Sequence, residues 1–113
     1  MDKHDIQVIE KIYVHVQSLM DYCKGIDTFE AFQSNKMLVE ACVFNLMQIG
    51  ELAKSMLSDD AKAQLSAIPW NQLYGMRNRI VHGYSGVNLS IVWETIQDDI
   101  PLLGNEIKSY IQY

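Results

Sequence analysis

The sequence predicts an all-α protein, an antiparallel up-and-down bundle of four main helices plus short helices. Apolar residues recur at three- and four-residue steps along most of the chain, which is the periodicity of one-sided helices. No segment alternates with a period of two for long enough to make a convincing strand. The length of 113 residues suffices for one core and is too short for two, so residues 1–113 are expected to form a single domain.

The first expected helix begins near Asp2 or Asp5, either of which can cap its start, and it ends at Gly25. Thr28 then caps a helix of about one turn. The buried stripe of the first helix is predicted to contain Ile6, Ile9, Ile12, Tyr13, Val16, Leu19, Met20 and Cys23.

The second long helix is expected over residues 34–57, and its broad apolar surface indicates burial on more than one side. Gly50 lies inside it, where glycine costs about 1 kcal/mol relative to alanine, and we interpret it as a point of close approach by another helix. Cys42 on this helix and Cys23 on the first helix both fall on apolar stripes. We expect both to be small core residues, because nothing indicates the secreted context that a disulfide needs.

The remaining helices are marked by prolines and caps. After a short capped helix and a turn, Pro69 is well placed at the first position of the next helix. That helix should end at Gly83 in a left-handed glycine cap. Asn88 can cap the last helix, and Pro101 should kink it near residues 97–101, because proline lacks an N–H and its ring clashes with the preceding turn.

Composition and charge narrow the function classes. The chain is 49% hydrophobic and 20% charged, which is the balance of a soluble globular protein. No apolar run approaches the length of a membrane span, and the N-terminus lacks an apolar signal core, so we expect a cytoplasmic protein with no membrane partner. The net charge of −5 argues against broad, charge-driven nucleic-acid binding, and no DNA partner is expected, although a small local site remains compatible with it.

Polar and charged side chains concentrate in residues 77–84, with the sequence RNRIVHGY. Asn78 and His82 are four residues apart and share a helix face, so Asn78 can orient the imidazole of His82. Arg77 is adjacent around the helix axis, and Tyr84 can turn back over the helix end. A histidine or arginine in the last turn of a helix is also favoured by the helix dipole alone, so a purely structural role stays open.

The side chains of this cluster suit chemistry on a phosphodiester. His82 can take or give a proton near neutral pH, and Arg77 stays charged and fits a phosphate bidentately. No carboxylate cluster lies nearby in the sequence to hold magnesium, so the site is expected to work without a metal or other cofactor. Metal-free cleavage suits RNA, whose 2′-hydroxyl can be the nucleophile. Because an acid and a base are both needed, a homodimer that duplicates the site across a two-fold axis is expected.

Three segments resemble the HepT-like toxin branch of the HEPN superfamily. RNRIVHGY carries that branch's pattern of Arg-Asn, three residues, His, any residue, Tyr. FNLMQIGELAK, residues 44–54, resembles its Asn-x4-Gly-Glu-Ala helix, with Leu52 where alanine is common. VNLSIVWETIQDDIPLLGNEI is similar to its last helix, including the proline. The resemblance covers nearly the whole chain, and the Arg–His motif shows no departure.

The resemblance implies an all-α homodimer and a metal-independent ribonuclease, the toxin of a type VII toxin–antitoxin pair. It implies that Arg77 and His82 are the catalytic pair, that Asn78 supports them, and that Tyr84 is a modification site. The implied partners are an RNA substrate and a minimal nucleotidyltransferase antitoxin, which transfers AMP groups to the tyrosine. Glu51 by itself is an exposed helix acid, whereas the family pattern suggests that it faces the cleft and ties down an arginine.

Two other functions stay open. A HEPN-like binding subunit that docks a nucleotidyltransferase or a nucleotide, with little nuclease activity, would fit the pI near 5.0 and the lack of a basic track. An intact His82 is hard to explain on that view. A structural helical dimer, with Trp70, Tyr74 and Trp93 as interface aromatics, would make the polar helix end incidental.

Overall fold

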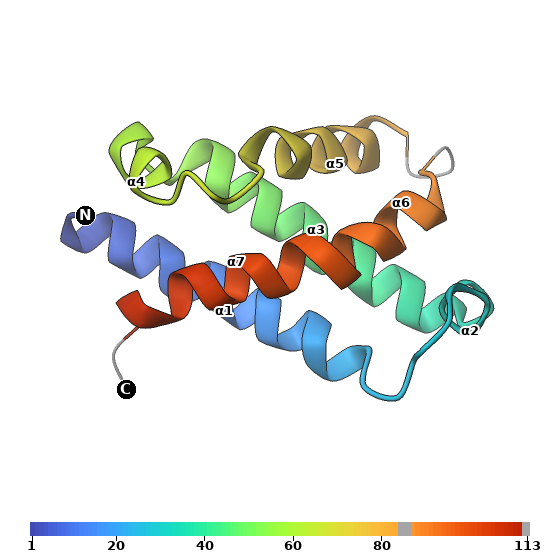
Figure 1. Cartoon of the computed structure of the whole chain (residues 1–113). Coiled ribbons are helices and arrows are strands. Elements are labelled where there is room, and N and C mark those ends of the chain that lie inside the picture. Colours follow the sequence, from blue (N-terminus) through green and yellow to red (C-terminus); the bar gives the residue numbers. More distant parts are fainter. Residues whose placement is uncertain (84–86, 112–113) are drawn as a thin grey trace.

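The computed structural model describes residues 1–83 and 87–111, and these residues contain helices and turns but no strand, which confirms the predicted all-α class (Figure 1). The elements are α1 (Lys3–Tyr22), α2 (Phe29–Gln33), α3 (Lys36–Ser55), α4 (Asp59–Gln64), α5 (Trp70–His82), α6 (Leu89–Glu94), a π-helical turn (Thr95–Asp99), α7 (Ile100–Ile107) and a 3₁₀ turn (Lys108–Tyr110).

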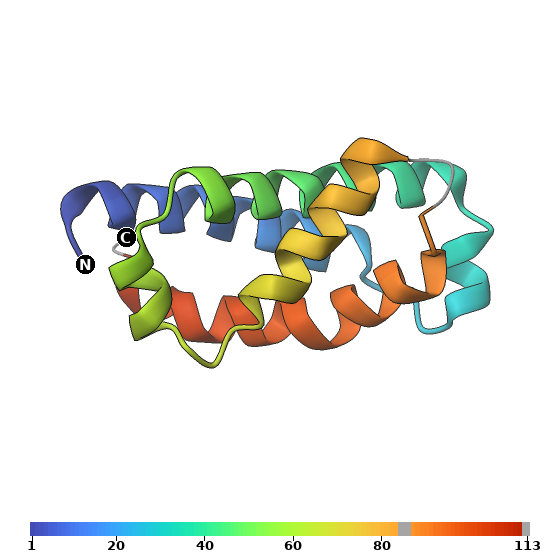
Figure 2. The same ribbon diagram turned by 90° about the horizontal axis from the view of Figure 1, so that it is seen from above.

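Three helical segments run along the length of the molecule: α1, α3 and the continuous rod made by α6, the π-helical turn and α7 (Figure 2). Helix α5 crosses obliquely in that view, and it packs mainly on α3, which also packs on α1. Helix α1 in turn contacts α7. Figures 1 and 2 show that these four segments alternate in direction along the chain, with α5 tilted relative to the other three.

One hydrophobic cluster joins these helices. Its largest fully buried side chains include Ile9, Ile12, Leu19, Phe32, Ile49, Ile100, Leu103 and Ile107. Most of the predicted α1 stripe faces this cluster, but Met20 is exposed and does not belong to the core. The helical periodicity therefore predicted most of the core, but it missed the buried Val8 and included Ile6, which does not belong to the cluster.

The start of α1 is tied to the start of α4. Asp2 caps α1, with its carboxylate accepting a hydrogen bond from the backbone N–H of Asp5 at 2.8 Å. Asp5 is buried and accepts hydrogen bonds from the Ser58 backbone N–H at 3.0 Å and the Ser58 hydroxyl at 2.7 Å. Of the two proposed caps, Asp2 is the cap, and Asp5 is a buried link between two segments. At the other end of α1, Gly25 adopts a φ of +79°, which favours glycine.

Three boundary predictions can be compared with the structure. Pro69 is the N-cap of α5, and the helix begins one residue later at Trp70. Gly83 ends α5 with a φ of −175°, which is extended backbone, so the predicted left-handed cap is wrong. The helix is irregular just before Pro101, where Thr95–Asp99 form a π-helical turn, while the kink expected near residues 97–101 stays a prediction. The proline thereby falls in the first turn of α7, where its missing N–H is not needed.

The two cysteines lie side by side as free thiols, with 3.7 Å between their sulfur atoms. Cys42 is fully buried and Cys23 is half-buried, so the expected core position is confirmed for Cys42. Burial raises the pKa of both thiols, and most strongly that of Cys42. None of the described helices is long and apolar enough to span a bilayer.

Candidate functional site

Helices α3 and α5 touch at Gly50, which confirms the close approach predicted there. A Cβ atom built on Gly50 would lie 2.5 Å from the Cβ of Arg77 and 3.1 Å from the backbone oxygen of Leu73. Carbon atoms in contact lie about 3.5–4.0 Å apart, so only glycine allows the helices to cross at this separation. Because Arg77 is itself the contact residue, the crossing presses the stem of this side chain against α3.

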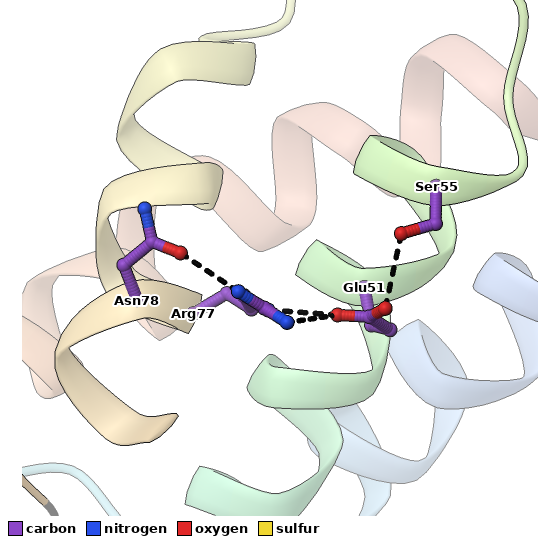
Figure 3. Close-up of polar contacts among 4 residues, drawn as sticks. All are labelled: Glu51, Ser55, Arg77 and Asn78. Atoms are coloured by element: carbon purple, nitrogen blue, oxygen red, sulfur yellow. Dashed lines mark hydrogen bonds and ion pairs between the residues drawn. The ribbon is translucent and has the colours of Figure 1, made fainter. Parts of the chain in front are cut away.

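The guanidinium of Arg77 is held between an acid on α3 and an amide on α5 (Figure 3). Its Nε donates a hydrogen bond to Glu51 Oε2 at 2.7 Å, and its Nη2 lies 2.6 Å from the same oxygen. Its Nη1 donates to Asn78 Oδ1 at 2.9 Å. On the far side of the carboxylate, the Ser55 hydroxyl donates to Glu51 Oε1 at 3.0 Å. Ser55, Glu51, Arg77 and Asn78 thus form one hydrogen-bonded chain across the two helices, which we call the arginine clamp.

The arginine clamp keeps Glu51 ionised. The hydrogen bond from Ser55 is the largest influence that lowers the pKa of this carboxyl, followed by the hydrogen bond from Arg77. The side chains of Arg77 and Glu51 are 21% and 44% exposed, so water screens the ion pair and its contribution to stability is small. The clamp therefore acts mainly by fixing where the guanidinium lies.

The clamp does not use all the donors of Arg77. A guanidinium carries five N–H groups, and the clamp engages one each on Nε, Nη1 and Nη2. Nη1 and Nη2 each retain one further N–H group, which can donate a hydrogen bond to a phosphate oxygen. A guanidinium with these two nitrogens available can bind two oxygens of one phosphate group.

Among the other motif residues, Asn78 makes a different contact from the one expected. The Oδ1 of Asn78 accepts from Arg77, so the expectation that this amide orients His82 is replaced by support of the arginine. His82 is the last residue of α5 and is exposed, and no side-chain hydrogen bond from it occurs among residues 1–83 and 87–111. Arg77 and His82 point in different directions, because residues five apart are roughly 140° apart around a helix. Tyr84 lies outside the described residues.

Asn45, the asparagine of the segment 44–54, lies away from the arginine clamp. It is buried, its Nδ2 donates to the backbone oxygen of Ala41 at 2.8 Å, and its Oδ1 lies 2.8 Å from Nδ1 of His15. Since the amide nitrogen is the donor to Ala41, Oδ1 is the acceptor, and Nδ1 of His15 carries the hydrogen. Asn45 therefore links α3 to α1 and does not touch Arg77.

The second arginine of RNRIVHGY faces the opposite side of α5. Arg79 lines a cavity of about 570 Å³ between α5 and the π-helical turn, together with Glu94, Asp98 and Asp99. Burial, followed by the charges of Asp98 and Glu94, raises the pKa of Asp99. Arg77 does not line this cavity, which is therefore separate from the arginine clamp. The described part of the chain contains no group of three or more His, Cys, Asp or Glu residues that could hold a metal ion.

The sequence interpretation did not include Ser55. Its position four residues after Glu51 places the two side chains on one face of α3, so the spacing could have indicated it. A serine in the last turn of a helix is common on solvent-exposed surfaces, however, and only the structure shows that its hydroxyl is turned to the carboxylate that holds Arg77 (Figure 3).

Comparisons with known proteins agree with the resemblance noted in the motifs. The family model described as "Ribonuclease HepT-like" matches residues 12–110. A "Putative RNase" of Caldanaerobacter subterraneus is 38% identical over 104 residues, which cover 92% of this chain and 91% of the relative. A "Putative RNase" of Methanocaldococcus jannaschii is 32% identical over 113 residues, covering 99% and 96% of the two chains.

A third relative, the "Probable ribonuclease HepT" of Thermococcus cleftensis, is 32% identical over 95 residues, which cover 84% of each chain. No solved protein structure matches the chain significantly. The family match covers most of the chain, and the region that it covers contains the whole arginine clamp and His82. The chain therefore belongs to the HepT-like ribonuclease family of the HEPN superfamily.

Proposed function

We propose that this protein is a metal-independent endoribonuclease, that it acts as a homodimer, and that Arg77 and His82 carry out the cleavage. The observation that supports this most strongly is the arginine clamp, which holds one guanidinium from two sides and leaves donors on Nη1 and Nη2. His82 lies at the end of the same helix with its side chain exposed. An oriented cation and a titratable imidazole are the groups that phosphodiester cleavage needs.

The reaction uses the 2′-hydroxyl of RNA as its nucleophile. The imidazole of one His82 takes the proton of that hydroxyl while the 2′-oxygen forms a bond to phosphorus. The bond from phosphorus to the 5′-oxygen breaks, and the imidazolium of a second His82 gives its proton to that leaving oxygen. The products are a 2′,3′-cyclic phosphate and a free 5′-hydroxyl. Arg77 donates to the non-bridging oxygens and stabilises the charge that they gain in the transition state.

The homodimer supplies the second imidazole, and the apolar residues beside the clamp support its proposed interface. Met37 and Phe44 are 82% and 53% exposed, and they precede Glu51 on α3 by fourteen and seven residues. Two turns of helix take about seven residues, so these three side chains lie in one row. Val81, one turn after Arg77 on α5, is also exposed. Large apolar side chains around a polar centre are typical of a surface that another protein covers.

The partner that regulates the enzyme is proposed to be a minimal nucleotidyltransferase antitoxin, which makes this chain the toxin of the pair. Its reaction joins the Tyr84 oxygen to the α-phosphorus of ATP and releases pyrophosphate. Tyr84 follows His82 by two residues in the sequence, which supports an inhibitory effect of the modification. The added phosphate would place negative charge two residues along the chain from His82, where it would repel the RNA backbone.

The test compares alanine variants in an RNA cleavage assay that contains a metal chelator. We expect His82→Ala and Arg77→Ala each to lower the cleavage rate by at least about 100-fold. Arg79→Ala is the matched control, because this second arginine of α5 faces the other side of the helix and should leave the rate unchanged. Wild-type cleavage by His82→Ala in chelator would contradict the proposal.

The second candidate is a binding subunit that docks a nucleotidyltransferase or a nucleotide without cleaving RNA. The pairing of Arg77 with Glu51 favours it, because the carboxylate offsets much of the positive charge that would attract RNA. The net charge of −5 acts in the same direction. The same assay separates the two functions: a binding subunit would leave every RNA intact as the wild type while forming a stable complex with the transferase.

A further inference from the structure

The arginine clamp extends one residue beyond the motifs, to the last residue of α3. We propose that Ser55 is a positioning residue of this site, which sets the orientation of the Arg77 guanidinium by holding one oxygen of Glu51. The inference rests on the proposed function for its effect on catalysis, but the effect on Arg77 can be measured without any reaction.

The two carboxylate oxygens of Glu51 have different partners. Oε1 accepts from Ser55 at 3.0 Å, while Oε2 lies 2.7 Å from Nε and 2.6 Å from Nη2 of Arg77. The carboxylate thus meets the guanidinium with a single oxygen. The more common arrangement of such a pair is bidentate, with two parallel N–H···O hydrogen bonds. Ser55 withholds the second oxygen and so opposes the bidentate arrangement (Figure 3).

Without the Ser55 hydroxyl, the carboxylate has two other ways to satisfy Oε1. It can rotate so that each oxygen meets one nitrogen of Arg77, which would draw the guanidinium further onto α3 and neutralise more of its charge. It can also swing toward Lys54, whose charge is close enough to lower the pKa of Glu51. The Glu51 side chain is 44% exposed, so packing does not prevent either movement. In both cases, Nη1 and Nη2 no longer point where the clamp now directs them.

The geometry of α3 makes Ser55 suitable for this role. Residues four apart lie one above the other on a helix, so the hydroxyl is near the Glu51 carboxylate before any substrate binds. A serine in a helix often hydrogen-bonds instead to the backbone oxygen four residues earlier. Here the hydroxyl donates to the side chain of that residue. With Asn78 on the other side of the guanidinium, both ends of the clamp are short polar side chains on helices.

The hydroxyl of Ser55 also affects the titration of Glu51. The charged groups that influence this carboxylate are Arg77 from α5 and Lys54 from α3, and Ser55 adds the hydrogen bond with the largest lowering effect on its pKa. Removing the hydroxyl should therefore raise the pKa of Glu51 toward its ordinary value. Protonated Glu51 no longer holds Arg77, so on acidification the NMR signal of the Arg77 Nε–H group should change at a higher pH in Ser55→Ala than in the wild type.

The first measurement needs no RNA. The chain has only two arginines, so its ¹⁵N NMR spectrum contains two Nε–H signals, and Arg79→Ala identifies that of Arg77. In Ser55→Ala, we expect a shifted Arg77 signal and proton exchange with water that is about five- to tenfold faster. Ser55→Thr keeps the hydroxyl and should restore the wild-type signal. Ser66→Ala removes an exposed serine hydroxyl in the turn before α5, away from the arginine clamp. As a control, it should leave the Arg77 signal and its exchange rate unchanged.

The second measurement is RNA cleavage with the same variants. Ser55→Ala should lower kcat/KM by about five- to tenfold and leave Tm unchanged, while Ser55→Thr recovers the wild-type rate. An Arg77 signal, an exchange rate and a cleavage rate that all match the wild type in Ser55→Ala would overturn the inference. If the wild-type protein cleaves no RNA, the proposed function fails, and the exchange rates alone decide the role of Ser55.

Discussion

Replacing Gly50 by alanine tests the link between helix packing and the site. The added Cβ would meet the Cβ of Arg77 at 2.5 Å, its Cγ at 3.1 Å and the backbone oxygen of Leu73 at 3.1 Å. A backbone oxygen and a Cβ cannot move without the helix that carries them. Since carbon atoms in contact need about 3.5 Å, α5 must shift away from α3 by roughly 1 Å.

Two opposing energies set the effect of Gly50→Ala on stability. Alanine is favoured over glycine inside a helix by about 1 kcal/mol. Overpacking a tight contact costs about 1–3 kcal/mol, so the expected net loss is on the order of 1 kcal/mol, or a fall in Tm of about 4 °C. The same shift of α5 also disturbs the arginine clamp. The hydrogen bond of 2.7 Å between Arg77 and Glu51 would lengthen beyond bonding range if the helices separate by roughly 1 Å.

Gly75→Ala is the matched control, because this glycine lies within α5 and nothing comes within 4 Å of a Cβ built on it. It should gain up to about 1 kcal/mol and raise Tm. Thermal unfolding followed by circular dichroism, together with the Arg77 Nε–H signal, measures both variants. A Gly50→Ala protein that is stabilised as much as Gly75→Ala and keeps the Arg77 signal would refute the reasoning about this helix crossing.

Three further predictions concern other parts of the molecule. The hydrogen bond from the Ser58 hydroxyl is the main cause that holds the pKa of Asp5 below its ordinary value. The Asp5 carboxylate therefore stabilises the fold at pH values above its unfolded pKa of about 3.9. This contribution is lost as the pH falls through the pKa of Asp5 in the folded protein. Urea unfolding should therefore show that Asp5→Asn is less stable than the wild type at pH 7 and loses less stability on acidification. Equal losses of stability in the two proteins on acidification would contradict the proposed effect of the Asp5–Ser58 hydrogen bonds. Burial strongly raises the pKa of Cys42, so iodoacetamide at pH 8 should label this thiol only when the protein is unfolded in urea. If mass spectrometry finds the same labelling of Cys42 in the native and the unfolded protein, its burial is contradicted. Phe44→Glu should convert the proposed homodimer into monomers in sedimentation experiments, and an intact dimer would move the interface elsewhere.

The sequence predicted the helices and most of the core because helical periodicity is a local property. It failed where a feature depends on contacts between helices. The close packing of α5 on α3 depends on Gly50, which lies outside the α5 sequence. Met20 lies at the edge of the α1 stripe, where a small rotation of the helix decides between core and solvent. The extended backbone of Gly83 shows that a glycine after a helix indicates an end but not its conformation.

The candidate site was predictable to the extent that its residues share one helix. The position of Asn78 next to Arg77 is evident from the sequence, but which of two neighbours its amide contacts depends on rotamers. Glu51 lies 26 residues before Arg77, and only the family resemblance connected the two before the structure paired them. Ser55 was missed because its importance comes entirely from the carboxylate next to it.

The proposed active site is composite and needs His82 from both subunits of the dimer. Wild-type and His82→Ala chains can be mixed in equal amounts, refolded together, and assayed for RNA cleavage in chelator, with sedimentation to verify dimers. Random pairing makes about a quarter of the dimers fully wild type. Because only these dimers carry two His82 side chains, we expect activity to fall to about a quarter of that of the same total amount of wild-type protein. A fall to only one half would show that each chain cleaves RNA alone, and it would contradict the composite site.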